Sequence, residues 1–165
     1  MNQYISHLIT KHRATGVLID TNLLILLCTG RYDPSLIGRF NRTDSFLLED
    51  YIHLNRIIEQ FNTIHTTPNI LTEVSNLVNL KGKKLEEFSR FLSTFIEESM
   101  ECYIPSIDIA KDNAFSTLGL ADAAVVMSAQ KYLIITVDLP LYGYLSNLGL
   151  EAINFNHIRG IGWLR

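Results

Sequence analysis

The chain alternates short runs of apolar residues with longer segments in which apolar residues recur every three or four positions. The short runs predict β-strands and the longer segments predict amphipathic α-helices. The predicted strands are, in chain order, Gly16–Ile19, Thr63–Thr66, Cys102–Ile104, Tyr132–Thr136 and Ala152–Phe155. This alternation predicts an α/β fold, a three-layer sandwich with a central parallel sheet of about five strands and helices on both faces.

The helix boundaries are marked by residues that start or stop a helix. Thr67 is placed to cap a helix whose first residue is Pro68 and which runs to about Leu80. The break at Lys81–Lys84 precedes another helix that ends near Glu97. Further helices are predicted at Ile107–Phe115, Leu120–Lys131 and Leu139–Leu148.

Residues 30–61 are predicted to be an insertion into a single domain that spans residues 1–165, with its core at about 17–156. Gly30–Asp44 has the composition of a loop, and Phe46–Phe61 carries an apolar stripe at helical spacing. Such a stripe either packs on its own domain or forms an interface with a partner, including a second copy in a homodimer. The sequence leaves both alternatives open.

Two acidic residues directly follow predicted strands. Asp20 ends the first apolar run, and Asp138 ends the run from Tyr132 to Val137. Either acid could merely cap the helix that follows it. However, the carboxyl ends of parallel strands meet at one edge of a sheet, where open α/β sheets bind ligands. We therefore expect Asp20 and Asp138 to lie on one surface.

Two further acids lie on predicted helices. Asp122 is surrounded by small apolar residues and shares a helical face with Val125 and Val126, so its carboxylate is expected to point inward. An inward carboxylate is unfavourable unless it is paired, protonated or bound to metal, although a first-turn acid can also interact with the helix dipole. Glu73 lies one turn into the helix that starts at Thr67, on the flank of its apolar stripe, where a solvated surface role is the alternative.

Four carboxylates brought together would repel one another unless cations neutralise them. Carboxylate and water ligands suit Mg²⁺ or Mn²⁺ better than zinc. Such ions stabilise charge on a phosphodiester and can activate a bound water as the nucleophile. The acids Asp20, Glu73, Asp122 and Asp138 therefore predict a metal site that acts on a polyanion.

The order and spacing of these strings resemble the PIN-domain family over about residues 17–156. The matching strings are Asp20-Thr21-Asn22, Thr72-Glu73-Val74, Leu120-Ala121-Asp122-Ala123-Ala124 and Ile135-Thr136-Val137-Asp138. The resemblance implies a metal-dependent nuclease with Asp20, Glu73, Asp122 and Asp138 as catalytic, metal-coordinating residues and Asn22 and Thr136 as polar neighbours. It also implies an RNA substrate and, by similarity to VapC-type toxin ribonucleases, an antitoxin protein as partner.

Composition and charge restrict the other possibilities. A net charge of −3 and a pI near 5.9 argue against a broad basic surface for nucleic acid, so contacts with RNA must be local or assisted by metal. Cys28 and Cys102 lie far apart with no CxxC spacing, so we expect neither a disulfide framework nor a zinc site. No apolar window is long enough for a membrane helix, and we expect a cytoplasmic protein.

Two alternative functions stay open. A receiver or dehalogenase-like phosphatase would also use a parallel sheet, but the first needs paired acids after strand one and a lysine after its last strand, and the second needs a DxD motif. Here Asp20-Thr21-Asn22 supplies DxN, and Asn154-Phe155-Asn156 ends the last strand. The other alternative is a non-catalytic PIN-like binding module, which would have no need to keep four mutually repelling acids.

Overall fold

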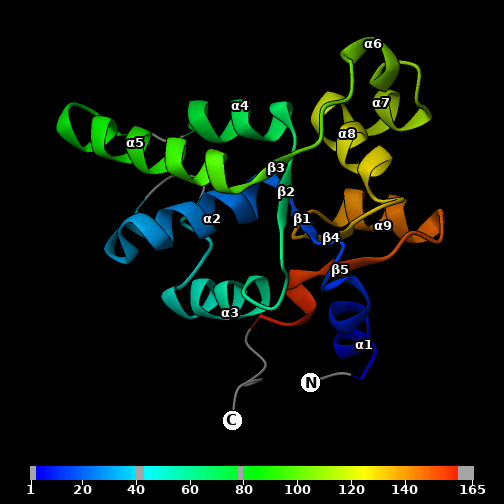
Figure 1. The fold of residues 1–165 in the computed structure, drawn as a ribbon, viewed down its shortest axis with the longest axis horizontal. Coiled ribbons are helices and arrows are strands. Elements are labelled where there is room, and N and C mark those ends of the chain that lie inside the picture. Colours follow the sequence, from blue (N-terminus) through cyan, green and yellow to red (C-terminus); the bar gives the residue numbers. More distant parts are fainter. Residues whose placement is uncertain (1–2, 40–42, 78–79, 160–165) are drawn as a thin grey trace.

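The computed structural model describes residues 3–39, 43–77 and 80–159 (Figure 1). In this part of the chain five parallel strands form one sheet in the order β3-β2-β1-β4-β5. The strands are β1 (Val17–Ile19), β2 (Ile64–Thr66), β3 (Met100–Glu101), β4 (Leu133–Thr136) and β5 (Ala152–Asn154). The predicted five-stranded parallel sheet is confirmed.

Helices cover both faces of this sheet. Figure 1 shows one layer on one side, made of α2 (Thr21–Tyr32), α3 (Leu48–Ile58), α4 (Pro68–Leu77) and α5 (Lys83–Glu98). The other side carries α1 (Gln3–His12), α8 (Leu120–Ser128) and α9 (Leu139–Asn147). The short helices α6 (Ser106–Ile109) and α7 (Asn113–Leu118) lie next to α8, and two 3₁₀ turns cover Pro34–Leu36 and Phe155–His157.

The core lies on both sides of the two central strands. Every residue of β1 and β4 is buried, as expected where helices cover both faces of a parallel sheet. Helix α2 is buried without interruption from Leu23 to Gly30, which is the pattern of a helix enclosed on all sides. Asp20 caps the amino end of this helix, so the packing of α2 in the core holds the backbone of Asp20 in place.

The third strand differs from its prediction. The strand was expected at Cys102–Ile104 but lies at Met100–Glu101, and only the amide of Cys102 extends the pairing, donating to the carbonyl of Thr66 at 2.8 Å. The reason is that β3 is an edge strand with both residues exposed. Burial does not impose an apolar pattern there, so the apolar residues that follow gave a misleading signal.

Three helical segments also differ. The helix predicted at Ile107–Phe115 is split into α6 and α7, because the Asp112 carboxylate accepts a hydrogen bond from the Ala114 amide and starts a new helix. The loop predicted at Gly30–Asp44 begins later, since α2 continues through Gly30 to Tyr32; residues 40–42 lie outside the described residues. Helix α1, which was not predicted, buries Ile5, Leu8 and Ile9.

The helix predicted at Phe46–Phe61 is α3, shortened at both ends. Of its apolar stripe, Leu54, Ile58 and Phe61 are buried in the core of the same chain, whereas Leu47 is exposed. Packing on its own domain, one of the two alternatives for this stripe, is thus confirmed for most of it. The end of the helix predicted to reach Leu80 falls on residues 78 and 79, outside the described residues.

None of the helices in the described ranges combines the length and the apolarity needed to cross a membrane.

Candidate active site

The strand order places a crevice at the carboxyl ends of β1 and β4. From β1 the chain proceeds outward to β2 and β3, then returns to the other side of β1 and continues through β4 to β5. The helices that follow β1 and β4 therefore lie on opposite faces of the sheet, and a ligand crevice opens between such strands. Asp20 follows β1 directly, and Asp138 lies two residues beyond the end of β4.

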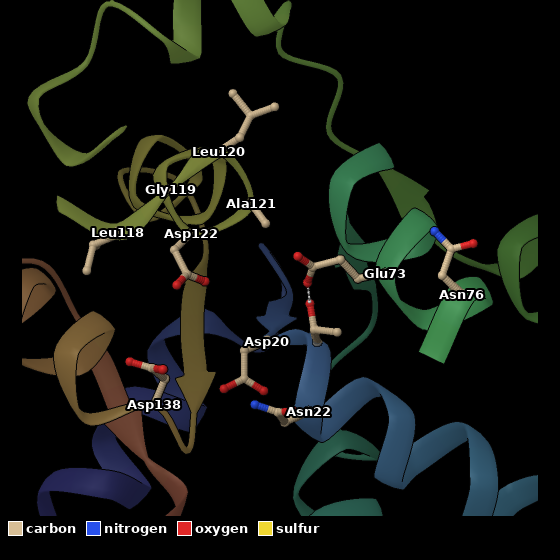
Figure 2. A pocket seen from close by; sticks show the side chains of 11 residues that line it. Asp20, Asn22, Glu73, Asn76, Leu118, Gly119, Leu120, Ala121, Asp122 and Asp138 are labelled. Carbon is tan, nitrogen blue, oxygen red and sulfur yellow. Dashed lines mark hydrogen bonds between the residues drawn. The ribbon is translucent and has the colours of Figure 1, made fainter. Parts of the chain in front are cut away.

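A cavity of about 390 Å³ lies at this position. Figure 2 shows the carboxylates of Asp20, Glu73, Asp122 and Asp138 directed toward a common space within it. The described residues that line it are Asp20, Thr21, Asn22, Glu73, Asn76, Leu118, Gly119, Leu120, Ala121, Asp122 and Asp138. The structure thus brings together all four acids that the sequence singled out, together with Asn22.

Asp20 is the most enclosed of the four acids, with 4% of its surface exposed. Burial raises the pKa of Asp20, and the nearby charge of Asp138 raises it further. Hydrogen bonds from the Thr136 hydroxyl, the Leu23 amide and the Val137 amide oppose that shift, because each donor stabilises the ionised carboxylate. The side chain is therefore fixed in position at the floor of the cavity.

Thr136 links Asp20 to Asp138 through hydrogen bonds. Its buried hydroxyl donates to Asp20 Oδ2 and accepts a hydrogen bond from the backbone amide of Asp138 at 2.8 Å. Thr136 does not line the cavity itself. Its place is that of a support for the two strand-end acids.

Both strand-end acids also cap helices, as the simpler interpretation of the sequence proposed. Asp20 Oδ1 accepts from the Leu23 amide, and Asp138 Oδ1 accepts from the Leu141 amide, each at 2.8 Å. Capping occupies only one oxygen of each carboxylate. Within the described part of the chain, the second oxygen of Asp138 accepts no hydrogen bond, so capping leaves it available to a ligand. The second oxygen of Asp20 accepts from the Thr136 hydroxyl and the Val137 amide.

Asp122 stands in the first turn of α8, above the carboxyl end of the sheet. The preceding Gly119 has φ +85° and ψ 178°, a conformation essentially restricted to glycine, and it turns the chain so that α8 starts at the cavity. Burial raises the pKa of Asp122 to about 6, and the charges of Asp138, Asp20 and Glu73 contribute. The predicted inward orientation holds in part, since Asp122 is half-buried while Val125 and Val126 on the same face are buried.

Glu73 reaches the cavity from α4 and remains exposed. The Thr21 hydroxyl donates a hydrogen bond to Glu73 Oε2 at 2.5 Å, which Figure 2 shows as a dashed line. Thr21 and Asn76 line the site but were not identified from the sequence. The position of Thr21 immediately after Asp20 was the available signal for Thr21, whereas its hydrogen bond to Glu73 on α4 depends on how two helices cross.

The donor set suits a hard divalent cation. The described polar side chains at the cavity offer carboxylate, amide and hydroxyl oxygens, which Mg²⁺ and Mn²⁺ prefer, and none of them is a thiol or an imidazole. As they stand, no three His, Cys, Asp or Glu side chains among the described residues are close enough to hold a metal ion. Side-chain rotation by exposed Glu73 and half-buried Asp122 is needed to close on one, and the cavity leaves room for it.

Comparison with known proteins adds no relative: no protein-family model matches the sequence, and neither a curated protein nor a solved structure matches it. The chemistry of the site therefore follows from its own residues and from the spacing of the four acids.

Proposed function

We propose that this protein is a metal-dependent nuclease that hydrolyses phosphodiester bonds in RNA, with Asp20, Glu73, Asp122 and Asp138 as its metal-coordinating residues. One observation carries the proposal: four acids from four separate elements line one cavity at the switch point of the sheet, and three of the charges act on the pKa of the fourth, Asp122. A binding site without cations would gain nothing from this repulsion.

The residues divide into fixed and adjustable groups. Asp20 and Asp138 are held by backbone amides and by Thr136, so they define where a cation would lie. Glu73 and Asp122 project from helices on opposite sides of the cavity and can adjust to the substrate. When bound, Mg²⁺ or Mn²⁺ would neutralise charge on the phosphodiester and lower the pKa of an attacking water.

The strand order separates this site from a receiver-type phosphotransfer domain. Receiver sheets follow the order 2-1-3-4-5, whereas this sheet follows 3-2-1-4-5. A lysine after the last strand is also needed there, and here Asn154 ends β5. The phosphodiesterase reaction is therefore the better interpretation of the four acids.

The resemblance to PIN-domain nucleases supports RNA as the substrate and a VapC-type toxin–antitoxin pair as the setting. A ribonuclease toxin should arrest growth when it is expressed alone in a bacterium, and a small protein encoded beside it should relieve the arrest. Expression of the Asp122→Asn variant at the same level is the control. Equal arrest by both forms would contradict toxicity through this site.

The direct test is cleavage of a labelled single-stranded RNA by the purified protein. We expect cutting with Mg²⁺ or Mn²⁺, none in EDTA, and a loss of at least about 100-fold in Asp122→Asn, in the range typical for removal of a group that stabilises transition-state charge. Glu97→Gln, an exposed acid of α5, is the matched control. Binding of Mn²⁺ without cleavage of RNA or DNA would instead support a non-catalytic module.

A further inference from the structure

A second hollow adjoins the acidic cavity. Its volume is about 350 Å³, and Glu73, Leu120 and Ala121 line both hollows, so they form a common wall. Figure 2 shows the side chain of Leu120 pointing away from the carboxylates. The remaining lining comes from the first turns of α4, from the segment that follows β3 and from the first residue of α6: Pro68, Asn69, Thr72, Tyr103, Ile104 and Ser106. A substrate bound at the acids has an adjoining space for its next unit.

Tyr103 gives this hollow an open aromatic surface. The residue is 75% exposed. The neighbouring Ile104 packs against the core, so the backbone that carries the ring is anchored. An exposed aromatic residue that lines a concavity offers a face on which an unpaired nucleobase can stack.

The charge of the hollow favours a base over a phosphate. Among the described residues that line it, Glu73 is the one charged residue, and there is no lysine or arginine. A phosphate would be repelled there, whereas a neutral planar group would not be. Among the described residues the Asn69 side chain makes no hydrogen bond, so its amide is available as both donor and acceptor for a base edge.

We infer that this second hollow, the Tyr103 hollow, binds one unpaired base of the RNA next to the scissile phosphate. The base stacks on Tyr103, and the Asn69 amide contacts its edge. A base inside a duplex cannot enter, so the hollow selects single-stranded RNA over double-stranded RNA. This inference rests on the proposed nuclease function, since the acids supply the neighbouring phosphate-binding position.

The test compares two RNA oligonucleotides that differ by one abasic position beside the cleaved bond. With intact RNA, Tyr103→Ala should raise KM by about 5- to 150-fold, the range for loss of one base–aromatic stack. Tyr103→Phe keeps the ring and should stay near wild type. With abasic RNA, wild type and Tyr103→Ala should have the same KM, because the base that would stack on the ring is already missing. Tyr4→Ala, an exposed tyrosine on α1, is the matched control.

A second measurement separates stacking from edge recognition. Tyr103→Ala should raise KM by similar factors for RNAs with any of the four bases at this position, because every base has a face that can stack. Asn69→Ala should change the order of the four KM values, because each base has a different hydrogen-bonding edge.

The outcomes distinguish the two proposals. Suppose that wild type cuts RNA. If Tyr103→Ala then leaves KM unchanged, or raises KM for abasic RNA as much as for intact RNA, the Tyr103 hollow is rejected as a base site and the nuclease proposal stands. If wild type cuts no RNA, the nuclease is rejected. The dissociation constant of the uncut RNA then decides: weaker binding by Tyr103→Ala would retain the hollow as an RNA site, and equal binding would reject it too.

Discussion

The hydroxyl of Thr136 is hydrogen-bonded to the carboxylate of Asp20, across the two central strands of the sheet. The pairing of Ile19 with Ile135 places the two residues side by side at the carboxyl end of the sheet. Because the same hydroxyl accepts the Asp138 amide, Thr136 fixes the separation of the two strand-end acids. Because Thr136 is buried, loss of its hydrogen bond to Asp20 should lower the stability of the fold as well as disturb the site.

Replacing Thr136 with valine removes that hydroxyl and keeps the shape of the side chain. Asp20 loses one of its three hydrogen bonds, and the Asp138 amide loses its acceptor. We expect the free energy of unfolding to fall by about 1–3 kcal/mol, the usual penalty for unsatisfied buried polar groups. Urea denaturation measures this, with Thr136→Ser as the control that retains the hydroxyl. Equal stability of the valine variant would show that the hydrogen bond is not important for folding.

Asp122→Asn isolates the repulsion between the acids. Asp122 caps no helix, so the substitution removes charge without removing a capping bond, unlike Asp20→Asn or Asp138→Asn. In EDTA at pH 8 we expect this variant to melt at a higher temperature than wild type. Wild type should gain more from Mn²⁺, about 2.7 kcal/mol at 100 times the dissociation constant. Scanning calorimetry measures the melting temperatures, with Glu97→Gln as the control. If Mn²⁺ shifted the melting temperature of neither wild type nor Asp122→Asn, the metal site would be contradicted.

The raised pKa of Asp122 predicts a pH dependence with a definite sign. The folded state holds the proton to about pH 6, whereas the unfolded chain releases it near 3.8, so this group favours folding most at low pH. Its contribution is lost as the pH rises from about 4 to about 6, and it is constant above that range. In EDTA, the stability difference between Asp122→Asn and wild type should grow over this interval. A pH-independent difference in urea titrations would argue against the shift.

Three of the four acids have a local signature in the sequence, and Glu73 was predicted only through its combination with them. Asp20 and Asp138 directly follow apolar runs, and Asp122 stands among small apolar residues at a helix start. The hydrogen bond between Thr21 and Glu73 and the Tyr103 hollow could not be predicted, since both depend on which helices cross and on exposure. Those features arise from packing between segments far apart in the chain, which periodicity does not encode.

The buried strands of the fold were also predicted correctly, whereas some exposed elements were misplaced. Buried strands such as β1 and β4 carry continuous apolar runs that the two-sided cover of a parallel sheet requires. The exposed edge strand β3 lacks this constraint and was misplaced. Asp112 split a predicted helix because its capping bond outweighed the apolar spacing on either side.

Thr21→Val tests the hydrogen bond that holds Glu73. The substitution leaves the carboxylate in place but removes the donor at 2.5 Å. Because Glu73 is exposed, we expect stability to change little and the cleavage rate to fall by at most about 10-fold, less than in Glu73→Gln, which removes the charge. Thr21→Ser should restore the rate. If the valine variant lost as much activity as Glu73→Gln, Thr21 would itself contact the substrate or the metal.

Gly30 lies inside α2, in a segment that was predicted to be a loop, and it faces Tyr51 of α3. A Cβ added at Gly30 would lie 2.2 Å from the ring of Tyr51, so the absence of a side chain lets α3 approach α2. Gly30→Ala must displace that ring, and we expect a destabilisation of about 1–3 kcal/mol, as for other overpacked cores. The matched control is Gly143→Ala in α9, where nothing lies within 4 Å of an added Cβ and alanine should stabilise the helix by about 0.4–1 kcal/mol. Tyr51→Leu alone should destabilise the protein, but in the Gly30→Ala background it should restore part of the loss, because the two residues share one space. Urea denaturation of wild type, Gly30→Ala, Tyr51→Leu and the double variant measures that coupling. Additive effects would mean that the ring moves aside freely, and the close approach of α2 and α3 would then not be the reason for glycine at this position.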